Sequence, residues 1–158
     1  MSAPTRKRRT SARCIRGVAI VEMIVVLPLM LFMIFATAEF GRAFMQYNTL
    51  TKSVRDSARF VAEYAMLGQT QTINIDPILE SRTQNLVVYG SVAAGALQPL
   101  LPGLTPGNVT VAAVSGDDIS VTAVYAYQPI SPFINRFGIG GDSSALFTLR
   151  AQATMRAL

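Results

Sequence analysis

Residues 16–39 read RGVAIVEMIVVLPLMLFMIFATAE, and this stretch decides how the N-terminal part of the chain folds. From Val18 to Ala38 it holds 21 residues with a single charge, Glu22. An α-helix rises about 1.5 Å per residue, so this run is long enough to cross a hydrocarbon core of roughly 30 Å. Pro28 lies inside the run, where a membrane helix tolerates it as a kink. The stretch therefore predicts a transmembrane helix over 18–38.

The segment before the apolar run is strongly basic and contains no acidic residue. It carries six of the chain's 14 basic side chains: Arg6, Lys7, Arg8, Arg9, Arg13 and Arg16. Basic clusters beside a membrane helix stay in the cytoplasm, so this topology signal predicts a cytoplasmic N-terminus and a C-terminal part on the outer side of the membrane. From Val18 onward there are eight basic and nine acidic residues, a formal charge of −1. A basic nucleic-acid surface on the folded part is therefore not expected.

A glycine ends the basic segment, and an acid follows it five residues later inside the apolar run. Gly17 leaves no side chain to obstruct a peptidase at the membrane surface. Cleavage between Gly17 and Val18 would remove a basic leader peptide, residues 1–17, and create an α-amino group on Val18. Glu22 is costly in hydrocarbon unless it is paired or neutral. We therefore expect Glu22 to pair with the Val18 ammonium of a neighbouring subunit and to act in assembly; the other interpretation is an acid tolerated near the interface.

The residue inventory argues against an enzyme. The chain has no histidine, so a histidine-based catalytic triad and histidine metal ligands are excluded. The one cysteine, Cys14, lies in the basic segment, so an intrachain disulfide is excluded as well. No phosphate-binding or dinucleotide-binding glycine loop is found. We expect no catalytic residue, no metal, no cofactor and no small-molecule substrate.

Helical periodicity continues beyond the apolar run, over a predicted extramembrane extension at 39–68. Its apolar positions follow each other at intervals of four and three residues, a heptad pattern that we call the seam. The seam consists of Phe40, Phe44, Tyr47, Thr51, Val54, Ala58, Val61 and Ala65. Two interpretations are open: the seam packs on the chain's own C-terminal domain, or it contacts neighbouring subunits.

Residues 69–158 predict a small α+β domain. Asp76-Pro77 is typical of a helix start, and the helix should run to about Gln84. Residues 86–89 suit either a last helical turn or a strand. Three strands are expected at 109–114, 119–127 and 146–155, with a turn at 116–118. The predicted fold class is α+β: a long N-terminal helix, half transmembrane, packed on a small antiparallel sheet.

These motifs resemble those of a known family. Gly17 and Glu22 at the head of an apolar helix match the cleavage pattern of type IV prepilins. The longer stretch, including Leu27-Pro28, Glu39-Phe40-Gly41-Arg42 and Arg55-x-x-Ala58-Arg59, resembles the TadE/TadG family of the tight-adherence (Tad, Flp) pilus system. Met23 stands where the family usually carries Phe or Tyr.

The resemblance implies a minor pilin or pseudopilin that a prepilin peptidase cleaves after Gly17, with Glu22 and Met23 in the recognition region. Its implied partners are the inner membrane, the prepilin peptidase, and the other pilins and assembly proteins of the Tad system. It implies a single-pass inner-membrane protein that helps to assemble an adhesive pilus.

Two alternatives accept the same apolar run but differ in whether and where the chain is cleaved. The first is an uncleaved bitopic scaffold of the same secretion apparatus. The second is a secreted soluble protein, because Ala36-Thr37-Ala38 has the small residues of a signal-peptidase site. The first alternative keeps residues 1–17, whereas the second removes the whole apolar run.

Overall fold

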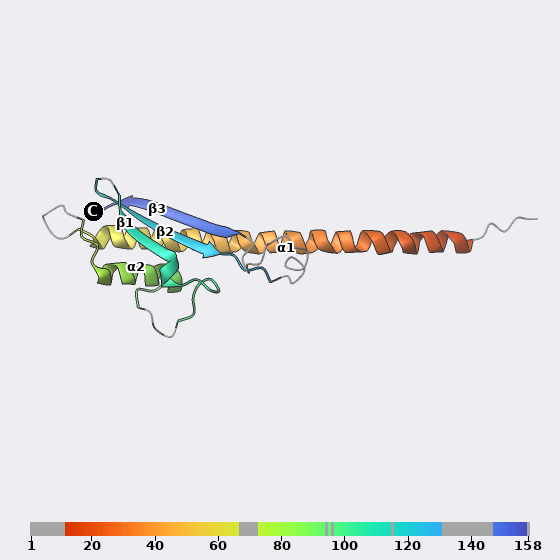
Figure 1. Ribbon diagram of the computed structural model, residues 1–158, viewed down its shortest axis with the longest axis horizontal. Coiled ribbons are helices and arrows are strands. Elements are labelled where there is room, and N and C mark those ends of the chain that lie inside the picture. Colours follow the sequence, from red (N-terminus) through yellow and green to blue (C-terminus); the bar gives the residue numbers. More distant parts are fainter. Residues whose placement is uncertain are drawn as a thin grey trace, which may run out of the picture. The chain divides into compact units, whose positions relative to one another are not determined.

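The computed structural model describes residues 12–66, 73–93, 95, 97–114, 116–130 and 147–157, with side chains from residue 17 onward. Its elements follow one another in the order α1, α2, a short 3-10 helix η2 (Pro106–Asn108), and strands β1 to β3. Figure 1 shows the helices α1 and α2 and the three strands. The chain divides into two compact units, Met1–Ala38 and Glu39–Leu158. Their boundary coincides with the end of the predicted apolar span.

The first unit is helical in its described part. Helix α1 (Ala12–Tyr64) begins within the basic segment rather than at Val18. Pro28 lies inside the helix and, having no N–H, leaves the carbonyl four residues earlier without its usual donor. The Thr37 hydroxyl donates to the Met33 carbonyl at 2.8 Å, so this polar group is satisfied by its own helix. Among the described residues, this is the one helix long and apolar enough to cross a membrane, a test that a signal sequence also passes.

The second unit contains a three-stranded antiparallel sheet in the order β1-β2-β3 (Figure 1). The strands are β1 (Val109–Ala113), β2 (Asp118–Ala126) and β3 (Thr148–Arg156). Strand β2 lies in the middle: Ala123 pairs with Val109 on one side and with Ala151 on the other. Gly116 connects β1 and β2 at φ 81°, a left-handed conformation that glycine adopts without strain. The sequence predicted these strands to within two residues at each end.

One face of the sheet is buried, as the alternation in the sequence predicted. On β2 the buried apolar positions are Ile119, Val121, Ala123, Tyr125 and Tyr127 just past the strand end. Ser120, on the other face, is buried too, and its hydroxyl accepts a hydrogen bond from Gln152. They join one apolar core with residues of the second half of α1, of α2 and of the loop before β1. The α+β arrangement of a long N-terminal helix on a small antiparallel sheet is therefore confirmed.

Helix α2 (Pro77–Tyr89) includes the ambiguous residues 86–89 as its last helical turn. Val87 and Val88 are fully buried there. A helix therefore removes these side chains from water as completely as a strand would. The helix ends at Gly90 in a left-handed conformation (φ 70°), and the Gly90 amide donates to Leu86. The Leu100 amide then donates to the Val88 carbonyl at 2.7 Å, which fastens the following loop to the helix end.

Candidate functional site: the Glu39 cluster at the end of strand β2

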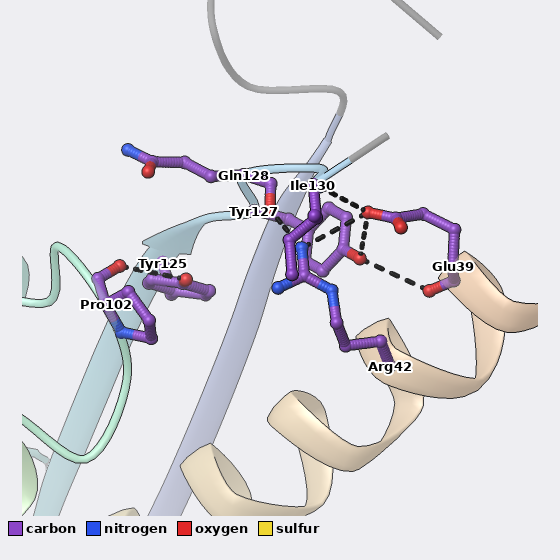
Figure 2. Close-up of polar contacts among 7 residues, drawn as sticks. All are labelled: Glu39, Arg42, Pro102, Tyr125, Tyr127, Gln128 and Ile130. Atoms are coloured by element: carbon purple, nitrogen blue, oxygen red, sulfur yellow. Dashed lines mark hydrogen bonds and ion pairs between the residues drawn. The ribbon is translucent and has the colours of Figure 1, made fainter. Parts of the chain in front are cut away.

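Glu39, the first residue of the second unit, accepts hydrogen bonds from a segment far along the chain (Figure 2). Its Oε1 atom lies 2.7 Å from the Tyr127 hydroxyl and 3.0 Å from the Ile130 amide nitrogen. The same hydroxyl lies 3.2 Å from the Glu39 carbonyl oxygen. The carboxylate thus fastens the start of the folded unit to the chain just after β2. We call Glu39, Arg42, Tyr127, Gln128 and Ile130 the Glu39 cluster.

Arg42 completes the cluster from the next turn of α1. One of its Nη atoms donates to Glu39 Oε1 at 3.2 Å and also to the carbonyl of Gln128. Its guanidinium carbon lies 5.1 Å from the centre of the Tyr127 ring, within the range of a cation–π interaction. Residues three apart on a helix share a face, so the Glu39–Arg42 spacing presents both charges to the same segment (Figure 2).

Tyr127 is held in place by its ring as well as by its hydroxyl. The ring is fully buried and stacks on Phe147 with centroids 4.9 Å apart and planes 9° from parallel. The Tyr127 amide donates to the Phe147 carbonyl at 3.0 Å. Tyr125, two residues earlier on the same face, donates instead to the carbonyl of Pro102 at 3.0 Å. Only the second of the two tyrosines therefore belongs to the Glu39 cluster.

The cluster stabilises the ionised form of Glu39. Burial by itself raises the pKa of this carboxyl, but the hydrogen bonds from Tyr127, the Ile130 amide and Arg42 outweigh it, so the pKa lies below its usual value. Burial and the hydrogen bond to Glu39 both raise the pKa of the Tyr127 hydroxyl, which stays a donor. The side chains of Glu39 and Arg42 are 13% and 27% exposed, so their ion pair is partly shielded from water.

The hydrogen bonds of this arrangement link α1 to the segment after β2, so the role they support is structural. Three donors converge on one carboxylate oxygen, and each comes from a different group of the same chain. Glu39 and Arg42 belong to the Glu39-Phe40-Gly41-Arg42 motif seen in the sequence. Their hydrogen-bond partners after β2 were not predicted. Tyr127 is 88 residues from Glu39, and no local pattern in the sequence connects them.

The predicted seam is divided between core and surface. The last four seam positions, Val54, Ala58, Val61 and Ala65, are buried in the core, as is Leu50 beside the seam. The first three positions are exposed instead: Phe40 is 74%, Phe44 58% and Tyr47 40% exposed. For these three, packing on the chain's own sheet was the wrong interpretation.

The physical reason is a shift of one position along the helix. In the part of α1 that begins at Glu39, the face turned to the core first carries Glu39, Arg42 and Ala43 and then Leu50. Only from Val54 onward are the buried residues those of the seam. Small and polar residues occupy this face because the Glu39 cluster packs there. The large aromatic side chains consequently point away from the sheet.

The residues of the predicted processing region lie along the exposed surface of the first unit. Gly17 is helical, and a Cβ atom built on it meets nothing within 4 Å. Val18 and Met23 are 69% and 62% exposed. Glu22 and Met23 lie on one stripe of α1 with Val26 and Met30, and all four side chains are exposed. The six basic side chains of the predicted topology signal lie outside the described side chains.

The geometry defines an α+β protein whose long N-terminal helix is apolar in its first part and packs on a small antiparallel sheet in its second part. Residues 17–59 match the model of a family described as TadE-like protein. This match confirms the resemblance seen in the sequence, and it covers the apolar run together with Glu39 and Arg42. Neither the curated proteins nor the solved structures gave a match to the chain.

Proposed function

We propose that this protein is a membrane-anchored minor pilin or pseudopilin of a Tad/Flp pilus system. The observation that carries the proposal is the match of residues 17–59 to the TadE-like family, which suggests a protein related to the Tad pilus. The matched segment contains the helix that is long and apolar enough to cross a membrane. The small domain that follows is fastened to the same helix at the first residue after the apolar run.

In this proposal the basic leader holds the N-terminus in the cytoplasm, and the domain from Glu39 onward faces the periplasm. A prepilin peptidase of the same system cleaves between Gly17 and Val18. The scissile bond lies inside α1, so the helix must open there for a peptidase to act. Glycine in a helix interior costs about 0.5–1 kcal/mol relative to alanine, which makes Gly17 a weak point at which the helix opens.

After cleavage Glu22 lies four residues after Val18, whose new ammonium group belongs to the same chain. Glu22 lies among exposed apolar side chains of α1, where an unpaired charge in hydrocarbon is costly. Pairing with the Val18 ammonium of a neighbouring subunit removes much of that cost and sets the register of two helices. Met23, the next residue along α1, packs beside this pair.

The proposal is tested by complementation in the native host. Deletion of the gene should abolish the adhesive pilus, and the wild-type chain should restore it. Glu22→Gln should insert in the membrane as wild type does but should not restore the pilus. A matched control is Asp56→Asn, which alters an exposed acid on the helix extension and should restore it. Full piliation of the deletion strain would overturn the proposal.

Two measurements separate the proposal from its alternatives. An uncleaved bitopic scaffold would keep residues 1–17, so its mass differs from that of a chain starting at Val18. A secreted protein cleaved after Ala38 would be released from membranes by carbonate, whereas the anchored protein stays in the pellet.

A further inference from the structure

Four exposed apolar side chains are close to members of the Glu39 cluster in the chain or belong to residues that contact them. Phe40 and Phe44 are 74% and 58% exposed on α1, next to Glu39 and one turn beyond it. Ile130, whose amide donates to Glu39, is 72% exposed. Phe147, whose ring stacks on the buried Tyr127, is 45% exposed. Four apolar residues on two separate parts of the fold thus meet water at the same end of the sheet, and we call them the apolar rim.

The covalent structure places this rim close to the end of the apolar run. Phe40 is two residues after Ala38, which at about 1.5 Å per residue is a rise of roughly 3 Å. The headgroup layers add about 10–15 Å to a hydrocarbon core of about 30 Å, or roughly 5–7 Å on each side. Ile130 reaches the same level because its amide lies 3.0 Å from a side-chain oxygen of Glu39. Phe44 is six residues after Ala38, a rise of roughly 9 Å, and helical side chains lean back toward the N-terminus of their helix. A bilayer that holds residues 18–38 therefore brings its headgroup layer to Phe40 and Ile130 and close to the ring of Phe44.

We infer that the apolar rim, Phe40, Phe44, Ile130 and Phe147, docks into the headgroup layer of the membrane in which α1 is anchored. The inference rests on the proposed membrane anchor and adds to it a second contact, made by the sheet domain itself. The aromatic rings of the rim suit this layer, because a membrane interface accepts large amphipathic and apolar rings beside polar groups. The Glu39 cluster holds the end of β2 at that depth.

The distribution of charge supports a lipid occupant. Between Ala38 and Lys52, helix α1 carries only Glu39 and Arg42, which neutralise each other at 3.2 Å. The opposite end of the sheet is charged and exposed, with the Asp117 and Arg156 side chains 41% and 76% exposed in their ion pair. The two ends of the sheet thus differ in exposed charge: the ion pair beside the rim is mostly shielded from water, whereas the pair at the opposite end is exposed.

The chain has no tryptophan, so a single introduced tryptophan reports its own surroundings without background. The test uses the full chain reconstituted in phosphatidylcholine vesicles with and without brominated acyl chains, which quench tryptophan on contact. Phe147→Trp places the probe in the rim, and Ile130→Trp is a second probe that leaves the Tyr127–Phe147 stack intact. Val114→Trp is the matched control, since Val114 is 47% exposed at the opposite end of the sheet. Leu29→Trp, within the apolar run, gives the signal of full insertion.

The rim probes should lose a large part of their emission in brominated vesicles, between the strong loss at position 29 and none at position 114. Unquenched rim probes in a protein that resists carbonate extraction would overturn this inference and leave the anchor intact. Unquenched probes at every position, with release by carbonate, would overturn the anchor and the inference together. In a third outcome, the rim probes are shielded from acrylamide but are not quenched by brominated lipid, and the shielding increases with the protein-to-lipid ratio. That outcome would overturn the inference, because a second copy of the chain would then cover the rim.

Discussion

The hydroxyl of Tyr127 lies 2.7 Å from the carboxylate of Glu39, although the two residues are 88 positions apart in the chain. This hydrogen bond joins the middle strand of the sheet to the helix at the first residue after the apolar run. The ring below the hydroxyl is fully buried, so the bond is made at the edge of the core. Its formation requires that β2 and α1 already be packed in register.

Removing the hydroxyl while keeping the ring should weaken the folded unit. Tyr127→Phe preserves the stack on Phe147 and deletes the shortest donor to Glu39. Hydrogen bonds to charged groups contribute about 1.5–3 kcal/mol, so a loss in unfolding free energy of about that size is expected. Urea unfolding of the full chain in detergent, followed by the near-ultraviolet circular dichroism of tyrosine, measures it.

A double-mutant cycle shows whether that loss belongs to the Glu39 cluster. Glu39→Gln combined with Tyr127→Phe should be non-additive by about 0.5–3 kcal/mol, because the two residues share one bond. Glu39→Gln combined with Tyr125→Phe is the control, since Tyr125 donates to Pro102 instead, and its effects should add to within about 0.5 kcal/mol. Equal coupling in both pairs would contradict the cluster as described.

The ionisation of Glu39 should make stability depend on pH in the acid range. Its pKa in the folded state lies below 4.5, so the unfolded chain binds this proton first as the pH falls. The stabilisation is therefore fully present above the unfolded pKa and is lost as the pH falls through the lower folded pKa. Unfolding free energies of the wild type from pH 7 downward should fall more steeply below about 4.5 than those of Glu39→Gln. Parallel curves would show that this carboxylate does not contribute.

Truncation of two large side chains of α1 should change the unfolding free energy by very different amounts. Leu50 is fully buried, and Leu50→Ala should cost about 2–5 kcal/mol of unfolding free energy through lost contacts and a cavity. Phe44 is 58% exposed, and Phe44→Ala should change it by no more than about 0.5 kcal/mol. The same urea titration measures both. A larger loss for Phe44→Ala would mean that the seam position packs in the core after all.

A bulky residue at the processing site should block removal of the leader. Gly17→Leu should leave a chain that still contains Cys14 and therefore reacts with a maleimide after denaturation, whereas the mature wild type should not react. Gly41→Leu is the matched control: a Cβ there also meets open space on α1, and its leader should be removed normally. Loss of the cysteine from the Gly17 variant would show that cleavage occurs elsewhere.

Several features of the fold could be predicted because their signals are local. The alternation of Ile119, Val121 and Ala123 determines which face of β2 is buried, and it was correct. Residues 86–89 remained ambiguous, because four apolar residues in a row satisfy burial in a helix or in a strand. Strand β3 begins at Thr148, two residues after the predicted start at Leu146, which itself lies outside the described residues.

The Glu39 cluster could not be predicted, and the error in the seam has the same origin. A heptad pattern starting at Phe40 and one shifted by a single residue have the same period, so periodicity alone does not choose between them. Hydrophobicity favoured the aromatic residues. The shifted face is the one that is buried, because Glu39 and Arg42 form hydrogen bonds with Tyr127 and Gln128, far along the chain.

The most direct test of the proposed function is the N-terminal residue of the protein purified from the membranes of its native host, by sequencing together with intact mass. Processing after Gly17 predicts that the mature chain begins at Val18 and has lost the mass of residues 1–17. A chain that begins at Met1 or Ser2 would contradict cleavage, and one that begins at Glu39 would contradict the membrane anchor.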